Sequence, residues 1–295
     1  MKGIILAGGA GTRLHPITLG VSKQLLPVYD KPMIYYPLSI LMLAGIREIL
    51  IITTPHDKYA FENLLKDGKQ LGINIDYCIQ PEPKGIAEAF ILGKDFIGNE
   101  SVCLILGDNI FYGDGLKRYL KNGITNAQEN YSTIFGYYVK DPQRYGVIEF
   151  NELEEVERIV EKPQFTKSNY AATGLYFYPN NVVEMCQSLT PSKRGELEIT
   201  SLNQEYLKVK KLKTELLGRG YLWLDTGTHD ALNGANNIIK EIQDRQGTKI
   251  GCIEEIALFN QWITYEQLVS KMPHYNNLKN PYFSYIYELS CSKNL

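Results

Sequence analysis

A glycine-rich loop near the start of the chain carries the strongest chemical signal. The apolar run 3–7 is followed directly by Gly8-Gly9-Ala10-Gly11-Thr12-Arg13, and Lys23 comes ten residues after the arginine. Closely spaced glycines let backbone N–H groups approach phosphate oxygens, and the loop matches neither the Walker motif nor the dinucleotide-binding motif. A fork-shaped guanidinium and a compact ammonium beside such amides favour a triphosphate over a dinucleotide. The alternative, a tight turn with solvent-facing charges, is disfavoured by the positions of the two cations.

Two aspartates follow apolar runs elsewhere in the chain. Asp108 lies in Gly107-Asp108-Asn109, directly after the run 102–106, and Asp225 follows Trp223-Leu224. A carboxylate at the carboxyl end of a parallel strand points into the crevice where ligands bind, and Mg²⁺ is usually held by one or two carboxylates together with phosphate oxygens. Either motif alone is typical of a turn or a helix cap. Together with the glycine-rich loop, the two carboxylates predict a metal–nucleotide site.

Three smaller groups contain residue types that suit substrate contacts. Gln80 heads the segment 80–85, where its side-chain amide and the backbone of Gly85 could read the edge of a base. The pair Glu161-Lys162 places an acid beside a base, and 145–147 and 173–174 offer places where a sugar could lie against the backbone. For each group alone, an ordinary loop is the better interpretation, because Pro and Gly mark loops everywhere.

Several other kinds of chemistry are excluded. The sequence has no H-E-x-x-H or G-x-S-x-G motif, its four histidines have no ligand spacing, and no Ser or Cys stands in the setting of an activated nucleophile. With 31 basic and 33 acidic side chains, the net charge of −2 argues against nucleic-acid binding. The five cysteines include no C-x-x-C pair, and no apolar run reaches the roughly 18 residues of a membrane span. We therefore expect a cytoplasmic protein that binds neither nucleic acid nor a membrane.

The elements that must position these residues alternate along the first half of the chain. Apolar runs that predict strands occupy 3–7, 48–53, 73–79 and 102–106, and helix-like segments lie near 33–45, 57–67 and 85–97. Continuous apolar strands alternating with helices predict an α/β fold with a doubly wound, mostly parallel (Rossmann-like) central sheet. The segment 131–178 has more strand patterns and predicts a mixed-sheet extension, whereas 228–245 and 254–289 predict C-terminal helices.

Taken together, these motifs resemble those of the sugar-1-phosphate nucleotidylyltransferases, and specifically the short glucose-1-phosphate thymidylyltransferases. The resemblance covers about residues 1–260, and its segments are, in order, 8–14, 23–28, 31–34, 107–109, 144–147, 161–163, 195–200 and 223–228. The glycine-rich loop is specific to the superfamily, whereas the thymidylyltransferase assignment depends on Gln24, Gln80 and the segment 195–200. Ala172 is a mild departure, because the family often has a bulkier aliphatic residue there.

The resemblance implies an activity and an organisation of the chain. The activity is transfer of the thymidylyl group of dTTP to α-D-glucose 1-phosphate with Mg²⁺, which gives dTDP-glucose and pyrophosphate in the first step of dTDP-deoxysugar (rhamnose-type) biosynthesis. A homotetramer with a second nucleotide site for end-product inhibition is implied as well. We expect an α/β domain at 1–240, whose nucleotide part covers about 1–110 and whose sugar-phosphate part covers about 111–230, and a helical appendage at 241–295.

The resemblance also implies roles for individual residues. Those expected to hold the nucleotide are Leu6, Gly8, Gly9, Gly11, Thr12, Arg13, Lys23, Gln24, Gln80, Gly85 and Asp108. Those expected to contact the sugar phosphate are Asn109, Tyr145, Gly146, Glu161, Lys162 and Ala172. Five of the charged residues would act in catalysis: Arg13 and Lys23 on the triphosphate, Lys162 on the sugar phosphate, and Asp108 and Asp225 as the ligands of Mg²⁺.

Two alternatives stay open. The first keeps the chemistry and changes the substrate to UTP or another hexose 1-phosphate, because only a 5-methyl group separates thymine from uracil and contact with one methyl is worth about 1–3 kcal/mol. The second is a non-catalytic nucleotide-sensing subunit on the same fold. The set of cations and carboxylates disfavours it, since a sensor needs neither two metal ligands nor a lysine for a sugar phosphate.

Overall fold

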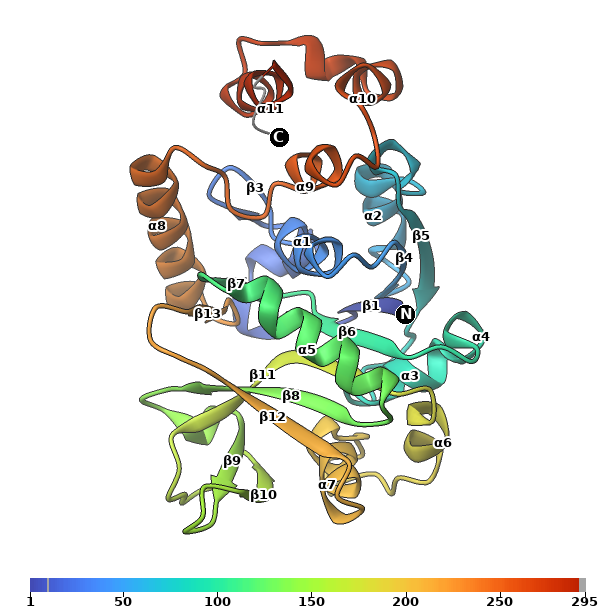
Figure 1. The fold of residues 1–295 in the computed structure, drawn as a ribbon, viewed down its shortest axis with the longest axis vertical. Helices are drawn as coiled ribbons and strands as arrows, with labels where there is room; N and C mark the ends of the chain where they lie inside the picture. Colours follow the sequence, from blue (N-terminus) through green and yellow to red (C-terminus); the bar gives the residue numbers. More distant parts are fainter. Residues whose placement is uncertain (10, 292–295) are drawn as a thin grey trace.

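Four parallel strands form the centre of the fold in the computed structural model, which describes residues 1–9 and 11–291. Ala10 of the glycine-rich loop and residues 292–295 of the C-terminal segment lie outside the described residues. The strands are β1 (Lys2–Ala7), β4 (Glu48–Thr53), β5 (Asn74–Ile79) and β6 (Val102–Leu106), in the spatial order β5-β4-β1-β6 (Figure 1). The order along the chain reverses between β1 and β6, so the carboxyl ends of these two strands flank the crevice in which such sheets bind ligands.

Helices cover both faces of the sheet, which is why the central strands are apolar on both sides. One face, which includes Ile5, packs against α1 (Tyr35–Leu43), α2 (Lys58–Leu65), α5 (Leu116–Gln128) and α9 (Ile253–Phe259). The other, which includes Ile4, packs against α3 (Glu88–Leu92), α4 (Lys94–Ile97), α6 (Val182–Gln187) and α7 (Ile199–Lys208). The expected single helix near 85–97 is two helices, because Gly93, a poor helix former, ends α3.

The second half of the chain widens the sheet. The long strand β11 (Tyr170–Tyr178) runs antiparallel to β6, and β8 (Ser132–Tyr138), β9 (Gly146–Phe150), β10 (Val156–Glu161) and β12 (Leu212–Leu217) extend it to nine strands. β12 lies parallel to β8, whereas β8, β9 and β10 form antiparallel pairs. The predicted α/β class, with a mostly parallel centre and a mixed-sheet extension, is confirmed.

Short ladders and turns complete the crevice. β7 (Asn109–Tyr112) pairs with β13 (Leu222–Asp225), and this register sets Asp225 opposite Asn109. A second small ladder joins β2 (Pro27–Val28) to β3 (Lys31–Pro32). The 3₁₀ turns are η1 (Thr12–Leu14), η2 (Ile17–Leu19), η3 (Lys23–Leu25), η4 (Lys69–Leu71), η5 (Pro142–Arg144) and η6 (Pro273–Asn276).

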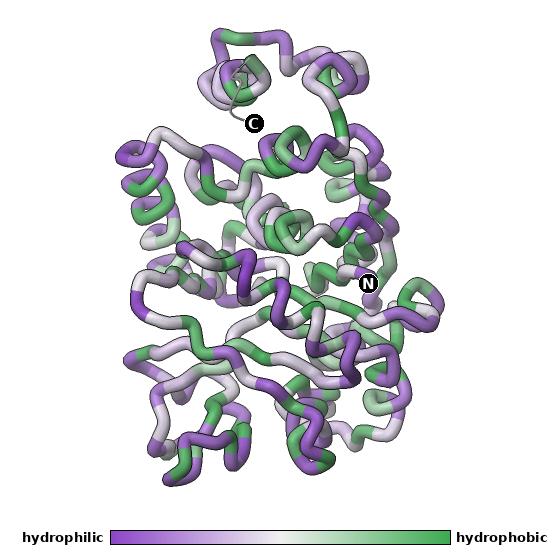
Figure 2. Tube along the Cα trace, viewed as in Figure 1, coloured by the Kyte–Doolittle hydropathy of each residue, from purple (hydrophilic) through white to green (hydrophobic). Residues whose placement is uncertain are grey.

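Three further helices lie toward the C-terminus. α8 (His229–Gln246) begins at Thr228, whose hydroxyl accepts a hydrogen bond from the backbone N–H of Ala231 at 3.2 Å. α10 (Tyr265–Lys271) and α11 (Pro281–Cys291) lie at the opposite end of the molecule from β9 and β10 (Figure 1). Hydrophobic segments concentrate in the central strands and in α1 (Figure 2). No helix among residues 1–9 and 11–291 is both long and apolar enough to cross a membrane.

The close contact between α5 and β11 gives a stability prediction. A Cβ atom added at Gly123 would lie 2.5 Å from a ring carbon of the buried Phe177, so the helix crosses the strand where only glycine fits. We expect Gly123→Ala to lower the free energy of unfolding by about 1–3 kcal/mol through overpacking, measured by urea denaturation. The matched control is Gly234→Ala in α8, where nothing lies within 4 Å of the added Cβ. This control should raise stability by about 0.5–1 kcal/mol, and equal effects at both glycines would contradict the prediction.

Candidate active site

A cavity of about 250 Å³ lies where β1 and β6 end. The backbone N–H of Gly107 donates to the carbonyl of Leu6 at 2.9 Å, which joins the turn after β6 to the last part of β1. Nine of the predicted residues line this cavity: Leu6, Gly8, Gly9, Gln24, Gln80, Gly85, Asp108, Glu161 and Lys162. Residues from both halves of the chain, predicted to contact the nucleotide and the sugar phosphate, therefore face one space.

The glycine-rich loop has a backbone that other residues could not adopt. A Cβ atom on Gly8 would lie 2.3 Å from Oε1 of Gln80, and Gly11 has a φ of +61°, in the left-handed region that glycine favours. The carbonyl of Gly11 accepts a hydrogen bond from the hydroxyl of Thr18 at 2.8 Å, which anchors the loop. Thr12 and Arg13 follow in the turn η1 with exposed side chains. Gly8 and Gly9 thus line the crevice with bare backbone, and Arg13 places an exposed cation beside it.

Asp108 is held as a charged carboxylate by its neighbours. The buried Lys23 forms an ion pair with one of its oxygens, and Nδ2 of Asn109 donates to the other at 2.9 Å. Burial acts to raise the pKa of Asp108, but the charge and hydrogen bond of Lys23 and the hydrogen bond from Asn109 outweigh it, so the pKa is lowered. The Asp108 side chain is therefore ionised at neutral pH.

Asp225 lies beside Asp108, and its pKa is shifted in the opposite direction. The neighbouring Thr226 donates its hydroxyl to the backbone carbonyl of Asp108 at 2.9 Å, which fixes the two strand ends together. Burial and then the like charge of Asp108 raise the pKa of Asp225, and the nearby cations, among them Arg13 and Arg144, offset this only in part. One Arg144 nitrogen lies 3.8 Å from a carboxylate oxygen of Asp225.

The two carboxylates fit the requirements of a divalent cation. A cation between them would relieve the repulsion that raises the pKa of Asp225. Within residues 1–9 and 11–291, no group of three or more His, Cys, Asp or Glu side chains could hold a metal ion. Further ligands would therefore come from water and from substrate phosphates, as is usual for Mg²⁺.

Asn109 holds the side chain of Asp108 in place through a hydrogen bond. Its Oδ1 accepts hydrogen bonds from the backbone N–H of Gly174 at 3.1 Å and from Nε1 of Trp223 at 2.7 Å, and it is buried. With one amide hydrogen directed to Asp108, a single N–H is left for a ligand. Tyr145, another predicted sugar contact, packs edge-on against Trp223 with the ring centroids 5.1 Å apart.

The remaining predicted sugar-phosphate residues lie together: Gly146 begins β9, Glu161 ends β10 and is followed by Lys162, and Ala172 lies in β11. Glu161 accepts a hydrogen bond from the hydroxyl of Thr200 at 2.6 Å, and its other oxygen lies 3.4 Å from Nζ of Lys162. Lys162 has a φ of +41°, a strained conformation for a residue with a Cβ and one that often occurs at functional sites. A Cβ on Gly146 would lie 3.0 Å from the hydroxyl of Thr200, 3.4 Å from Glu161 and 4.0 Å from Cβ of Ala172, so these side chains pack closely around the glycine.

The predicted base-reading residues lie at the opposite wall. The buried Gln80 donates Nε2 to Oε2 of Glu88 at 2.7 Å, and the buried Gln24 accepts a hydrogen bond from Ser22 at 2.9 Å. Gly85 has a φ of +103°, and a Cβ there would lie 2.3 Å from the carbonyl oxygen of Leu197. Glycine is therefore required at position 85.

Two backbone hydrogen bonds join the loops that carry these two walls. The N–H of Leu197 donates to the carbonyl of Lys84 at 2.7 Å, and the N–H of Ala87 donates to the carbonyl of Leu197 at 3.1 Å. We call this contact the Leu197 clasp. It links the segment 80–87, on the base side, to the segment 192–198, on the sugar side.

Several charged residues of the site were not predicted. Arg194, Glu196 and Glu198 line the cavity. A nitrogen of Arg194 lies 2.7 Å from Glu198 and 3.6 Å from Glu161, so a second cation stands near Lys162. Glu196 and Glu198 belong to the segment 195–200 of the resemblance, although no role was predicted for either residue, whereas Arg194 lies just outside that segment.

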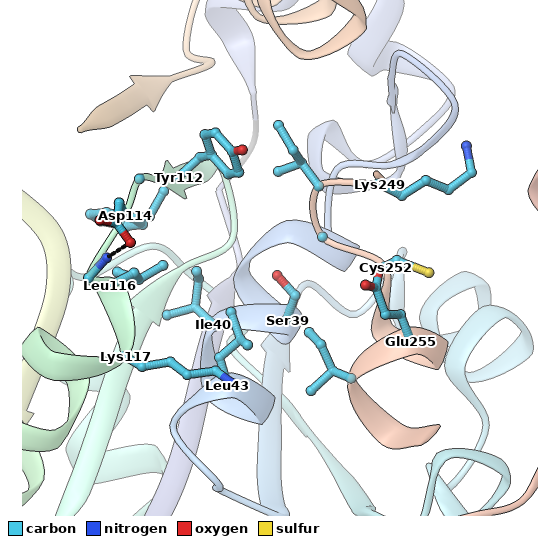
Figure 3. A pocket seen from close by; sticks show the side chains of 16 residues that line it. Ser39, Ile40, Leu43, Tyr112, Asp114, Leu116, Lys117, Lys249, Cys252 and Glu255 are labelled. Atoms are coloured by element: carbon cyan, nitrogen blue, oxygen red, sulfur yellow. Dashed lines mark hydrogen bonds between the residues drawn. The ribbon is translucent and has the colours of Figure 1, made fainter. Parts of the chain in front are cut away.

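A second, larger cavity of about 470 Å³ lies away from this crevice, between α1, the start of α5 and α9 (Figure 3). Tyr112, at the far end of β7 from Asn109, and Lys117, Lys249 and Glu255 are among its lining residues. Its walls thus combine an aromatic ring with charges of both signs. Sequence reasoning assigned no residue to this cavity.

The comparisons with known proteins agree with the geometry. The nucleotidyl transferase family model matches residues 2–242. A glucose-1-phosphate thymidylyltransferase of Neisseria meningitidis is 58% identical over 268 residues, which cover 91% of this chain and 92% of the relative. The structure of a putative glucose-1-phosphate thymidylyltransferase from Bacillus anthracis in complex with a sucrose has a TM-score of 0.75 and 41% identity, covering 81% of this chain and 94% of the other. A UDP-glucose pyrophosphorylase complexed with UDP-glucose has a TM-score of 0.71 and 27% identity, covering 82% and 98%.

Proposed function

The chain belongs to the nucleotidyl transferase family, and within it to the glucose-1-phosphate thymidylyltransferases; from this premise we propose that it transfers the thymidylyl group of dTTP to α-D-glucose 1-phosphate and releases pyrophosphate. The observation that carries the proposal is the cluster of Lys23, Asp108 and Asp225 beside the glycine-rich loop, in which Asp108 lines the same cavity as Glu161 and Lys162. This cluster supplies what a reaction between two phosphorylated molecules needs, namely amide donors, cations and paired carboxylates.

The reaction that suits these residues is an in-line displacement at the α-phosphorus of dTTP. An oxygen of the sugar phosphate attacks, the bond to the bridging oxygen breaks, and pyrophosphate leaves with the bond electrons. The attacking oxygen is already anionic at neutral pH, so no general base is needed. The proposal accordingly gives no histidine a catalytic role. Positioning two bound substrates can lower a barrier by about 7–11 kcal/mol, and this is the main task of the chain.

The cations neutralise the repulsion between the substrates. In the proposal, Arg13 binds the departing phosphates from the exposed turn η1, and Lys23 lies between the triphosphate and Asp108. Lys162, with Arg194 nearby, binds the phosphate of the sugar from the opposite wall. Such fixed charges are more effective in a partly desolvated site than in water, because they need no reorganisation when charge develops.

Mg²⁺ is the metal that we propose for the carboxylate pair. Asp108 and Asp225 would hold it, since their oxygens are hard ligands and the nearby cations compensate their mutual repulsion only in part. When bound, the ion neutralises negative charge on phosphate oxygens. Asn109 and Thr226 keep the two carboxylates side by side by holding the side chain and the backbone of Asp108.

Thymine is the base that we propose, with uracil as the closest alternative. The support for thymine is the 58% identity to a named thymidylyltransferase, against 27% to a UDP-glucose pyrophosphorylase. A wall that contacts one methyl group separates the two bases by only about 1–3 kcal/mol. Some turnover of UTP is therefore part of the proposal.

The experiment that tests this function is an assay of the purified chain with dTTP and α-D-glucose 1-phosphate. We expect pyrophosphate and dTDP-glucose in equal amounts, and we expect excess EDTA to stop the reaction and added Mg²⁺ to restore it. Parallel reactions with UTP and with other hexose 1-phosphates measure the specificity. Nucleotide binding without pyrophosphate release would favour the sensing subunit and contradict the enzyme.

Single substitutions test the roles of the charged residues. We expect Arg13→Ala and Asp225→Asn each to lower turnover by at least about 100-fold, the range for loss of one electrostatic group, without loss of the folded state by circular dichroism. Matched controls are Arg245→Ala and Asp244→Asn on the exposed face of α8, which should leave turnover unchanged. Near-normal pyrophosphate release from either active-site variant would contradict its assigned role.

The proposal extends to regulation and assembly. The resemblance implies a cytoplasmic homotetramer in dTDP-deoxysugar synthesis, with a second nucleotide site for end-product inhibition. We assign that site to the cavity between α1, α5 and α9, where Tyr112 offers a ring for stacking and Lys117 offers positive charge (Figure 3). Lys249 lines the same cavity, but its ammonium pairs with Asp30 at 2.6 Å. Its volume of about 470 Å³ is within the range that holds small ligands.

A substitution that fills this cavity tests the assignment. With dTDP-rhamnose as the probe, we expect inhibition that is not competitive with dTTP. Leu43→Trp places a larger side chain in the cavity wall and should exclude the ligand. We expect the inhibition constant to rise at least about tenfold, because a steric clash with the ligand weakens its binding by at least this factor. Turnover without inhibitor should stay normal. Ile238→Trp on exposed α8 is the control, and unchanged inhibition in Leu43→Trp would contradict the assignment.

A further inference from the structure

We propose that Glu88 is a positioning residue that sets base specificity by fixing the orientation of the Gln80 side-chain amide. The inference rests on the proposed function, since it concerns the base of the nucleotide that this site would bind. Glu88 is the first residue of α3, is half-buried, and lies behind the residues that line the cavity. It is not among the residues that line the cavity, so it acts on a bound base through the residues that it holds, above all Gln80.

One carboxylate oxygen of Glu88 holds two parts of the base-side wall. Oε2 accepts a hydrogen bond from Nε2 of Gln80 at 2.7 Å and another from the backbone N–H of Lys84 at 3.3 Å. The Gln80 side chain is only 4% exposed, and its Oε1 lies against Gly8, where a Cβ would come within 2.3 Å. The amide thus has its nitrogen toward Glu88 and its oxygen toward the glycine-rich loop.

This orientation determines which hydrogen bonds Gln80 can offer. A carboxamide has one acceptor oxygen and two donor hydrogens. With one hydrogen given to Glu88, Oε1 and the second hydrogen remain for a ligand, as an acceptor beside a donor. Thymine and uracil present the complementary pair, because N3–H donates and O4 accepts. Cytosine presents the reverse, with an acceptor at N3 and an amino group at C4.

Reading cytosine would require the amide to rotate by half a turn. Oε1 of Gln80 would then face the Glu88 carboxylate with no hydrogen between the two oxygens, and the hydrogen bond from Nε2 would be lost. A buried acceptor facing another acceptor is strongly disfavoured. Glu88 therefore selects bases with a keto group at C4 against cytosine, and it does not separate thymine from uracil.

The test compares kcat/KM for dTTP and dCTP in the wild type and in Glu88→Leu, with α-D-glucose 1-phosphate as the second substrate. Both nucleotides are measured on one preparation, so the fraction of folded enzyme cancels from the ratio. We expect the preference for dTTP to fall about 10- to 100-fold, the range for loss of one hydrogen bond to a charged group. KM for dTTP should rise, whereas KM for the sugar phosphate should stay within about twofold.

Two variants separate orientation from charge and from general damage. Glu88→Gln keeps an acceptor oxygen and should recover most of the preference for dTTP. Glu82→Leu removes an exposed carboxylate from the same loop without touching Gln80, and its preference should equal that of the wild type. Glu88→Ala is measured alongside, so that the ratio is obtained even where the leucine variant does not fold.

The outcomes distinguish this inference from the proposed function. An unchanged dTTP preference in Glu88→Leu or Glu88→Ala, or an equal loss in Glu82→Leu, would overturn the role of Glu88 while the enzyme itself stands. Equal impairment of Glu88→Gln and Glu88→Leu would also overturn it, because an acceptor oxygen would then not be what matters. A wild type that makes no dTDP-glucose from dTTP would overturn the proposed function, and the inference with it.

Discussion

The structure depends on the confinement of Asp108 and Asp225 side by side at the reversal point of the sheet. Two carboxylates in a buried crevice repel each other: burial and the like charge of Asp108 raise the pKa of Asp225, whereas Lys23 and hydrogen bonds lower the pKa of Asp108. The pair is tolerable only because Lys23 neutralises Asp108, and because Asn109 and Thr226 hold Asp108 in place. The glycine-rich loop, the β7–β13 ladder and the turn η3 can be understood as the elements that create and contain this charged centre.

The central sheet was predictable because its strands have a strong local signal. The runs 48–53 and 102–106 are continuous and apolar, and the strands β4 and β6 have these bounds. β12 was missed because Lys213 and Glu215 interrupt its apolar pattern, as suits a strand at the edge of a sheet. The β7–β13 ladder was missed for a different reason, since it pairs Asn109 with Asp225 across a large sequence separation and such pairing has no local signature.

The candidate site also contains some residues that the sequence could identify and others that it could not. Gly8, Gln80 and Asp108 could be singled out because each follows a strand of the parallel centre, and parallel strands bring their carboxyl ends to one edge. Lys162 follows the antiparallel strand β10, and its role came from the resemblance. Arg194 and Glu88 could not, because a charged residue in a loop or at a helix start has the same sequence pattern whether it faces solvent or a neighbouring side chain. Their positions depend on how separate segments pack, which the spacing of residues does not reveal.

The Leu197 clasp has a consequence for how this enzyme could diversify. Because backbone hydrogen bonds join the segment 80–87 to the segment 192–198, the two walls that we propose to contact the substrates are not independent of each other. Gly85 lies in close contact with Leu197, so a change in the turn within 80–87 would displace the segment 192–198. New preferences for the nucleotide and for the sugar would thus have to arise together. A single loop grafted from a distant homologue would not fit against the other loop, and it would not bring that homologue's specificity with it.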